Sequence, residues 1–229
     1  MEAGTLFVVA TPIGNMDDLS ARAADALKSA GIVACEDTRV TGNLLRRLGV
    51  SAQMFVYEDS RERAAAPALL KKLQEGVDVA LVSDAGTPCL SDPGFRIVRA
   101  CRASGVPVVP IPGPCAFVSA LCASGLPSDS FLFAGFLPPK TSARKSFFER
   151  HRDFGRTLIF YESPHRIEKF VDDALEVFGP ERTVCVAKEI SKVFERFFVG
   201  RLSDVARDLK ASSLKGEFVV IVAPEGFAL

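Results

Sequence analysis

Two carboxylates and a guanidinium lie close together in the stretch Cys35-Glu36-Asp37-Thr38-Arg39. The apolar run before them predicts a buried strand, and charged groups at the end of such a strand are costly unless they are paired or used. In a functional interpretation, Glu36 or Asp37 positions or deprotonates an acceptor group while Arg39 binds a phosphate. The alternative is a helix N-terminal cap with a local ion pair.

Three further stretches join a short apolar run to a turn rich in Gly and Pro. They lie at 6–15, 79–88 and 108–116. Apolar runs bounded in this way predict strands buried on both faces of a parallel sheet, where ligands bind at the carboxyl ends of the strands. Glycine lets the backbone approach a ligand and proline removes a donor, so these turns suit a ligand held by main-chain atoms. We expect the three turns to converge on one crevice.

Asp84 lies in the second of these turns, within Ser83-Asp84-Ala85-Gly86. Its carboxylate either takes part in a ligand site or hydrogen-bonds its own backbone, as Asp often does in turns. The chain contains no G-x-x-x-x-G-K-[ST] motif and no G-x-G-x-x-G between a strand and a helix. The two commonest nucleotide-binding fingerprints are therefore absent.

The composition bounds what the chain can be. Its 229 residues are 48% apolar, which is enough for one large domain or two small ones. Basic and acidic residues balance at 28 each, so contact with nucleic acid would need a local basic patch. No apolar stretch approaches the roughly 20 residues of a membrane span, and no basic leader is present. We therefore expect a cytoplasmic protein with no membrane partner.

Cysteine and histidine usage argues against metal chemistry. The six cysteines form no C-x-x-C pair and mostly lie in apolar settings, so we expect them to be reduced core residues. The only histidines are His151 and His165, which excludes a His-rich centre and disfavours a Ser-His-Asp triad. We expect no metal site, and catalysis must depend on other groups.

The elements that position these residues change in kind along the chain. In the first half, apolar and amphipathic segments alternate at the spacing of βαβ units, which predicts a mainly parallel sheet. We expect strands at 5–10, 32–35, 53–57, 78–82 and 107–111, and helices at 20–30, 39–48, 61–75 and 94–104. After Pro114, aromatic-rich segments predict a second sheet with strands at 131–136, 157–161, 183–188, 194–200 and 217–223.

The two halves predict two domains. We place their boundary at Pro112-Gly113, which gives an N-terminal, mainly parallel α/β domain at 1–112 and a C-terminal mixed α+β domain at 113–229. The short connection after 188 predicts an antiparallel hairpin within the second domain. Because small-molecule pockets favour clefts between domains, the Pro-Gly-Pro turn at the boundary is a candidate site as well as a hinge.

Eight short motifs in these elements match one known family when they are taken together. They are Ala10-Thr11-Pro12-Ile13-Gly14-Asn15, Glu36-Asp37-Thr38-Arg39, Ser83-Asp84-Ala85-Gly86-Thr87-Pro88, Ser91-Asp92-Pro93-Gly94, Pro112-Gly113-Pro114-Cys115-Ala116, Gly125-Leu126-Pro127-Ser128-Asp129, Phe160-Tyr161-Glu162-Ser163-Pro164-His165-Arg166 and Lys215-Gly216-Glu217. The motifs run in family order across nearly the whole chain. In them the chain resembles the tetrapyrrole methylase superfamily, the class III methyltransferases that use S-adenosylmethionine. It is most similar to the branch that methylates a cytidine 2′-hydroxyl of small-subunit (16S) ribosomal RNA.

The resemblance implies a homodimer with S-adenosylmethionine in the cleft between the two domains. The residues that it implies for cofactor binding are Pro12, Asp84, Ala85, Gly86, Thr87, Leu90, Cys115, Ala116, Glu162 and Ile190. The catalytic candidates are Glu36, Asp37 and Arg39. A ribose hydroxyl is a poor nucleophile, so a general base or a setting that favours the developing alkoxide is expected beside the cofactor.

A basic stretch between residues 140 and 156 is the candidate RNA surface. The residues that we expect to contact RNA are Lys140, Arg144, Lys145, His165 and Arg166. Such a patch neutralises phosphates, and its binding weakens with salt. The alternative is an ordinary solvated helix over buried phenylalanines. The resemblance favours RNA contact, with ribosomal RNA or the assembled small subunit as the partner.

One segment departs from the family pattern, and two other functions stay open. Many relatives carry a His-rich segment ending in Asn after the third strand, where this chain has Tyr57-Glu58-Asp59-Ser60-Arg61-Glu62. No role of that His or Asn carries over. A tetrapyrrole C-methyltransferase of the same fold is one alternative, although the first loop lacks the Gly-x-Gly-Pro-Gly-Asp form of that branch. A non-catalytic RNA-binding module is the other.

Overall fold

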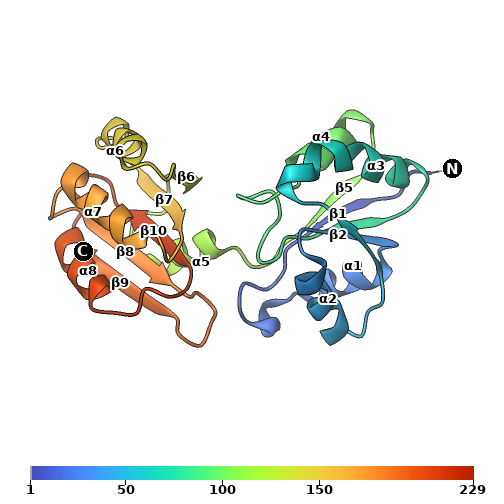
Figure 1. Cartoon of the computed structure of the whole chain (residues 1–229), viewed down its shortest axis with the longest axis horizontal. Coiled ribbons are helices and arrows are strands. Elements are labelled where there is room, and N and C mark those ends of the chain that lie inside the picture. The colour runs from blue at the N-terminus through green and yellow to red at the C-terminus, as the bar shows by residue number, and fades with distance from the viewer. Residues whose placement is uncertain (1) are drawn as a thin grey trace. The chain divides into compact units, whose positions relative to one another are not determined.

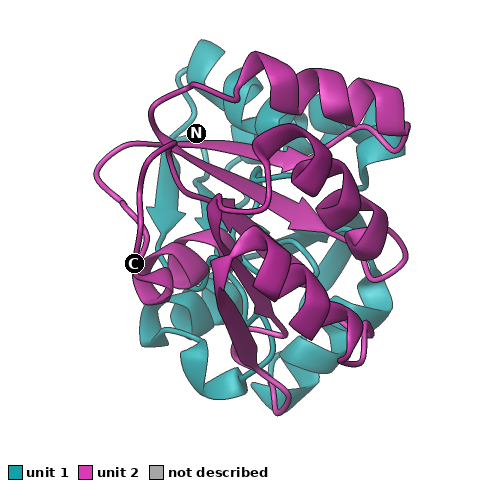
Figure 2. Cartoon of the chain, turned by 90° about the vertical axis from the view of Figure 1, so that its left-hand side faces the viewer, with its two compact units in different colours: residues 1–115 teal, residues 116–229 magenta. Residues whose placement is uncertain are grey.

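The computed structural model describes residues 2–229, which form two compact units, Met1–Cys115 and Ala116–Leu229 (Figure 2). The division therefore falls between Cys115 and Ala116, whereas the sequence placed it between Pro112 and Gly113. Each unit is built on its own five-stranded sheet. We call them unit 1 and unit 2 and describe each by itself.

Unit 1 is a parallel sheet between two pairs of helices (Figure 1). Its strands are β1 (Leu6–Val9), β2 (Ile32–Cys35), β3 (Gln53–Val56), β4 (Val79–Leu81) and β5 (Val108–Ile111). Its helices are α1 (Ala21–Ser29), α2 (Thr38–Arg47), α3 (Glu62–Gln74) and α4 (Phe95–Ala103), with short 3-10 turns at Met16–Asp18 and Asp59–Arg61. The strand order is β3-β2-β4-β1-β5, and all neighbours run parallel. The strands and helices predicted for this half are confirmed to within a residue at each end.

The central strands β2 and β4 are buried on both faces, which explains why they are apolar without alternation. Ile32 and Ala34 of β2 belong to the core shared with α3 and α4. Val33 and Cys35 point to the opposite face and belong to the core shared with α1 and α2. Because every strand is parallel, the carboxyl ends of all five lie at one edge of the sheet. We call this edge the carboxyl edge of unit 1.

Unit 2 is a mixed sheet with helices on both faces (Figure 1). Its strands are β6 (Phe131–Phe136), β7 (Thr157–Glu162), β8 (Thr183–Lys188), β9 (Arg196–Arg201) and β10 (Phe218–Val222), and its helices are α5 (Ala116–Ser124), α6 (Thr141–Arg150), α7 (Ile167–Phe178) and α8 (Leu202–Lys210). The order is β6-β7-β10-β8-β9, with β6 and β7 parallel and all other neighbours antiparallel. The predicted hairpin is confirmed as β8 and β9.

Aromatic side chains fill the core of unit 2. Phe148 of α6 and Phe160 of β7 pack against Phe170 of α7, with ring centroids 5.1 and 5.4 Å from it. On the other face, Phe117 of α5 stacks on Phe133 of β6 at 4.2 Å. Many of the aromatic side chains of the second half therefore form the core of unit 2.

Three further observations concern the whole described chain. None of its helices combines the length and the apolar character of a membrane span. No group of three or more acidic, His or Cys side chains in residues 2–229 is placed to hold a metal ion. None of the six cysteines forms a disulfide within these residues, and Cys35, Cys101 and Cys185 are buried.

Candidate functional site

The loops that follow β1, β4 and β5 are tied together at the carboxyl edge of unit 1. Thr11 and Gly86 form an isolated antiparallel bridge, in which the Thr11 N–H donates to Gly86 O at 2.8 Å and the Gly86 N–H donates to Thr11 O at 3.1 Å. The Thr87 hydroxyl donates to the carbonyl of Pro114 at 2.9 Å. The predicted convergence of the three turns is therefore confirmed.

Gly86 is required by the geometry of this junction. Its φ of +84° lies in the left-handed region, where a side chain is strained. A Cβ at this position would approach Ile13 Cγ2 to 3.3 Å. The Thr11 hydroxyl donates to Ser83 O at 3.2 Å and fixes the start of the same loop. These hydrogen bonds fix the backbone at Gly86, and no side chain covers it there. Such a backbone can bind a ligand through its main-chain atoms.

The ends of β2 and β4 are also tied to each other, through carboxylates. The Asp37 N–H donates to Asp84 Oδ1 at 3.2 Å, and the Asp84 N–H lies 3.4 Å from Glu36 Oε1. Each loop thus places an acidic side chain against the backbone of the other. The arrangement brings Glu36 and Asp84 together, although they are far apart in the sequence.

Asp37 and Arg39 form the cap and local ion pair that the sequence left open as an alternative. Asp37 is the N-cap of α2, and its Oδ1 accepts the Arg39 N–H at 2.8 Å. Arg39 Nη2 lies 2.6 Å from Asp37 Oδ2. Hydrogen bonds from Arg39 lower the pKa of Asp37 to about 2. Asp37 is therefore a firmly ionised, weakly basic carboxylate.

Glu36 has the opposite character. Burial, and then the charges of Asp92 and Asp84, raise its pKa to about 7. Burial also raises the pKa of Asp92 to about 6 and shifts the pKa of Asp84 upward. No basic side chain of the described chain forms an ion pair with Glu36 or Asp92. Glu36 and Asp92 are therefore poised to exchange protons near neutral pH.

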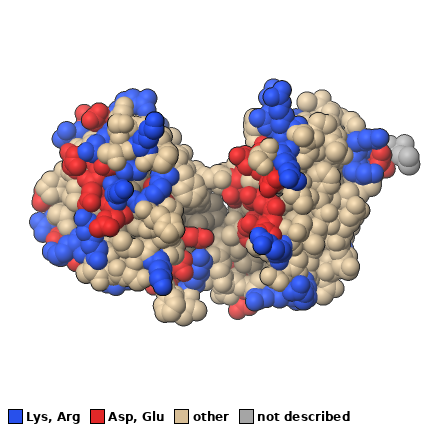
Figure 3. Space-filling view, in the orientation of Figure 1, with Lys and Arg blue, Asp and Glu red and all other residues tan. Residues whose placement is uncertain are grey.

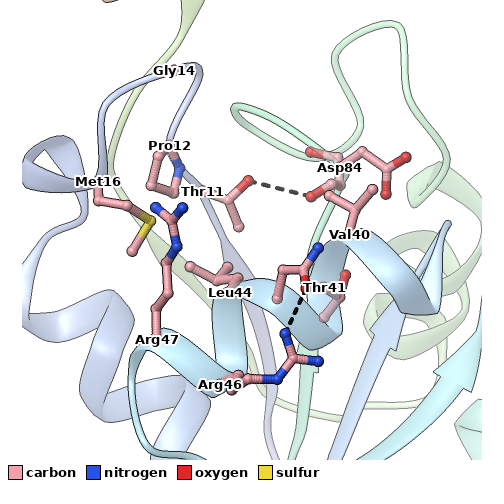
Figure 4. Close-up of a pocket in the computed structure, with 12 residues that line it drawn as sticks. Thr11, Pro12, Gly14, Met16, Val40, Thr41, Leu44, Arg46, Arg47 and Asp84 are labelled. Atoms are coloured by element: carbon pink, nitrogen blue, oxygen red, sulfur yellow. Dashed lines mark hydrogen bonds between the residues drawn. The ribbon is translucent and has the colours of Figure 1, made fainter.

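Two pockets open at this edge and share Asp84. The acidic pocket, of about 410 Å³, is lined by Glu36, Asp37, Thr38, Arg39, Val56, Glu58 and Asp84. The arginine pocket, of about 520 Å³, is lined by Thr11, Pro12, Gly14, Met16, Val40, Thr41, Asn43, Leu44, Arg46, Arg47, Ser83 and Asp84 (Figure 4). In Figure 3 the acidic side chains of unit 1 gather on one part of its surface, with basic side chains at the border.

The cofactor residues predicted in unit 1 lie around these loops. Pro12 lines the arginine pocket, and Asp84 lines both pockets. The next three residues, Ala85 to Thr87, form the junction with the first and third loops. Leu90, 36% exposed, lies further along the same loop, and Cys115 is the last residue of the unit. Their contact with a cofactor stays a prediction.

The cofactor residues predicted in unit 2 lie on three different elements. Ala116 begins α5, Glu162 ends β7, and Ile190 follows β8. The Glu162 carboxylate is buried and already engaged, since it accepts hydrogen bonds from the Ser163 N–H at 2.8 Å and from Arg166 at 3.0 Å. A role for these three positions in cofactor binding also stays a prediction.

The predicted RNA-binding residues of unit 2 fall into two groups. Arg144 is only 1% exposed, and its Nε donates to Asp173 Oδ2 at 2.7 Å. Lys145 pairs with Glu176, and Arg166 with Glu162 and the carbonyl of Leu137. These pairings argue against phosphate binding by Arg144 above all, because a buried guanidinium cannot reach an RNA strand. Lys140 and His165 are exposed, and their contact with RNA stays a prediction.

Sequence reasoning missed Asp92, Arg46 and Arg47 as site residues. Asp92 stood in one of the eight motifs, but only the fold shows that its charge faces Glu36. Arg46 and Arg47 are adjacent in a segment that the sequence identified simply as an amphipathic helix. Two consecutive arginines in the last turn of a helix were the available signal. It was weak, because basic residues commonly complement the dipole at that end.

Comparison with known proteins places the chain among methyltransferases. The model of the family described as Tetrapyrrole (Corrin/Porphyrin) Methylases matches residues 5–206. A protein of Pseudomonas aeruginosa named Ribosomal RNA small subunit methyltransferase I is 48% identical over 99% of this chain and 82% of its own length. A Vibrio cholerae protein of the same name is 49% identical over 96% of this chain and 77% of its own.

Solved structures show the same fold at low sequence identity. A cobalt precorrin-4 methyltransferase superposes with a TM-score of 0.68 at 13% identity, covering 96% of this chain and 94% of that one. A uroporphyrin-III C-methyltransferase from Thermus thermophilus, complexed with S-adenosyl homocysteine, gives 0.64 at 22% identity, covering 96% and 97%. At these identities the likeness establishes the fold alone.

Proposed function

The chain belongs to the tetrapyrrole methylase family, and we propose that it transfers a methyl group from S-adenosylmethionine to small-subunit ribosomal RNA, at the 2′-hydroxyl of a cytidine. The main support is the identity of 48% and 49% to proteins named for that RNA, over nearly the whole chain. The partner is then ribosomal RNA or the assembled small subunit. We further propose that the protein works as a homodimer in the cytoplasm.

The residues of unit 1 fit the cofactor. S-adenosylmethionine carries ribose hydroxyls, an adenine edge and a carboxylate, which suit the backbone groups of the loops joined by Thr11, Gly86 and Thr87. Its positive sulfonium suits a surface where Glu36 and Asp84 form no ion pair with any residue that the structure describes. When bound, the cofactor supplies a methyl group that is already activated. The protein must then align the acceptor and manage its proton.

Glu36 is the residue that we assign to the proton. Its carboxylate lines the acidic pocket, and its pKa of about 7 matches a general base that works at neutral pH. It would accept the proton of the ribose 2′-hydroxyl as the oxygen attacks the methyl carbon. Asp37 is a poorer base because Arg39 stabilises its ionised form.

Asp37 and Arg39 position the acceptor in this proposal. Asp37 caps α2 and donates its N–H to Asp84, so it fixes the acidic loop beside the second one. The Arg39 side chain is 88% exposed, and its Nη1 takes no part in the pair with Asp37. That free edge of the guanidinium suits a phosphate of the RNA.

The test is transfer of labelled methyl from S-adenosylmethionine to small ribosomal subunits that lack the native modification. Naked 16S RNA and a tetrapyrrole precursor are run in parallel, and the RNA product is digested to nucleosides. We expect label on 2′-O-methylcytidine. Label on the tetrapyrrole alone would show a C-methyltransferase. Binding to RNA without any transfer, and without a cofactor-induced rise in melting temperature, would show the non-catalytic module.

A further inference from the structure

The C-terminal turn of α2 places two arginines in one pocket. Arg46 and Arg47 both line the arginine pocket, and Figure 4 shows the Arg47 side chain extending toward Pro12 and Met16. Arg46 Nη1 donates to Asn43 Oδ1 at 2.7 Å, which fixes its guanidinium at the wall. Asp84 lies across the pocket from Arg47.

These two charges are uncompensated, unlike several others in the molecule. Arg39, Arg144 and Arg166 each pair with a carboxylate. Arg46 and Arg47 are exposed, and neither forms an ion pair with any residue of the described chain. The helix dipole favours a cation at this end only weakly. It does not explain why two neighbouring guanidinium groups both line a concavity. A bound anion does, because guanidinium donors match the oxygens of a phosphate.

We propose that Arg46 and Arg47 bind the phosphate of a nucleotide that flanks the methyl acceptor. The inference deepens the proposed function and rests on it. Helix α2 runs from Thr38 beside the acidic pocket to Arg47 in the arginine pocket, which is about 14 Å at 1.5 Å per residue. A phosphate held at the arginines therefore belongs to a neighbouring nucleotide and not to the ribose beside Glu36.

The charge pattern also gives the RNA strand a path. The carboxylates Glu36 and Asp84 repel phosphate, whereas Arg39 near one end of α2 and the two arginines at the other end attract it, so the backbone follows α2. Leu44 provides apolar wall between Asp84 and the arginines, and Met16 lies beside the Arg47 guanidinium, so a sugar or base can pack against this wall of the pocket. The neutral ribose of the acceptor is then the part of the RNA that meets the acidic side.

The test compares the double variant R46Q/R47Q with R63Q/R99Q. Arg63 on α3 and Arg99 on α4 are exposed, line neither pocket and form no ion pair within the described chain, so the control removes the same charge elsewhere on unit 1. Methyl transfer to unmodified small subunits is measured between 50 and 200 mM KCl, together with the Kd for S-adenosylmethionine. Thermal melting confirms that both variants are folded.

For R46Q/R47Q we expect a KM for subunits raised about tenfold or more, an unchanged cofactor Kd and a shallower salt dependence. The log–log slope should fall by about 0.7, which is the contribution of one phosphate contact with a single strand. R63Q/R99Q should match the wild type.

Two outcomes would overturn the inference alone while the wild type still methylates RNA. One is an unaltered KM and slope in R46Q/R47Q. The other is a weakened cofactor Kd with an unaltered slope, which would assign the arginines to the carboxylate of S-adenosylmethionine. If the wild type transfers no methyl to RNA, the proposed function and this inference fall together.

Discussion

The carboxyl edge of unit 1 and the interface of α6 with α7 in unit 2 both concentrate charge, and they treat it in opposite ways. At the interface, Arg144 is buried against Asp173, and Lys145 pairs with Glu176, so these four charges are compensated within the protein. At the carboxyl edge, burial raises the pKa values of Glu36, Asp84 and Asp92, and the charge of Asp84 adds to the shift of the other two. Glu36 and Asp92 form no ion pair in the described chain.

The difference separates charges that hold the fold from charges that are available to a ligand. A buried pair such as Arg144 with Asp173 is compensated within the protein, so neither charge is available to bind a ligand. Partly buried carboxylates that face one another store unfavourable energy, which proteins keep mainly where chemistry needs it. Substituting charged residues in each region, and comparing the effects on methyl transfer and on stability, therefore tests the account.

The largest effect is expected on the rate of methyl transfer when Glu36 is changed. Glu36→Gln keeps the shape and removes the base, so we expect the rate to fall about 10²- to 10⁴-fold. Glu58→Gln is the matched control, because Glu58 lines the same pocket but pairs with Arg61. Single-turnover transfer to unmodified small subunits measures both. Equal activity of the two variants would remove Glu36 from the mechanism.

The corresponding change in unit 2 should affect stability and leave the chemistry alone. Asp173→Asn leaves the Arg144 guanidinium buried without its counter-charge, and we expect the free energy of unfolding to fall by about 3–5 kcal/mol. Asp172→Asn breaks only an exposed pair with Lys210 and should cost about 1 kcal/mol or less. Urea titrations give both values. Equal stability of the two variants would show that the buried pair does not hold α6 and α7 together.

Glu36→Gln should stabilise the protein at high pH. The pKa of Glu36 is raised in the folded state, from 4.5 to about 7, so the wild type loses stability as pH rises through this window. At pH 8 the variant should gain about 1–2 kcal/mol, a value reduced from the full shift because Glu36 is partly solvated. At pH 5 most of the gain should vanish. Urea unfolding at both pH values tests this, and a gain independent of pH would contradict the burial of Glu36.

The smallest effect is expected for Lys145→Ala. Its partner Glu176 is largely exposed, so breaking the pair should change the free energy of unfolding very little. Because the lysine is already paired, the salt dependence of binding to small subunits should also stay as in the wild type. A shallower salt slope would instead restore the α6 surface as an RNA contact.

The sequence predicted the fold of unit 1 closely because its central strands β2 and β4 are buried on both faces. An uninterrupted apolar run such as Ile32–Cys35 is typical of a strand in the middle of a parallel sheet. Ser20 was also correctly predicted as the N-cap of α1, where its hydroxyl accepts the Ala23 N–H. In unit 2, α6 was harder to interpret. Its basic surface was apparent, but the burial of Arg144 depends on Asp173 from a different helix.

The candidate site could be located from sequence, but its roles could not be assigned. Glu36 and Asp37 are adjacent and chemically alike, yet their pKa values differ by several units in the folded protein. Arg39 stabilises the ionised form of one carboxylate locally. The pKa of Glu36 is raised by burial and by the charge of Asp92. Asp92 lies in the loop after β4, and only the fold brings that loop close to Glu36. Such roles depend on the distances between segments that are far apart in the sequence. These distances cannot be read from the residue types alone.

The most direct test of the account is the pH dependence of kcat/KM for methyl transfer to unmodified small subunits, in the wild type and in Glu36→Gln. We predict that the wild-type value rises with unit slope and levels off near pH 7, while the variant is slow and independent of pH across the same range. A variant that keeps the wild-type rate and profile would contradict the claim that the uncompensated carboxylates at the carboxyl edge of unit 1 carry the chemistry.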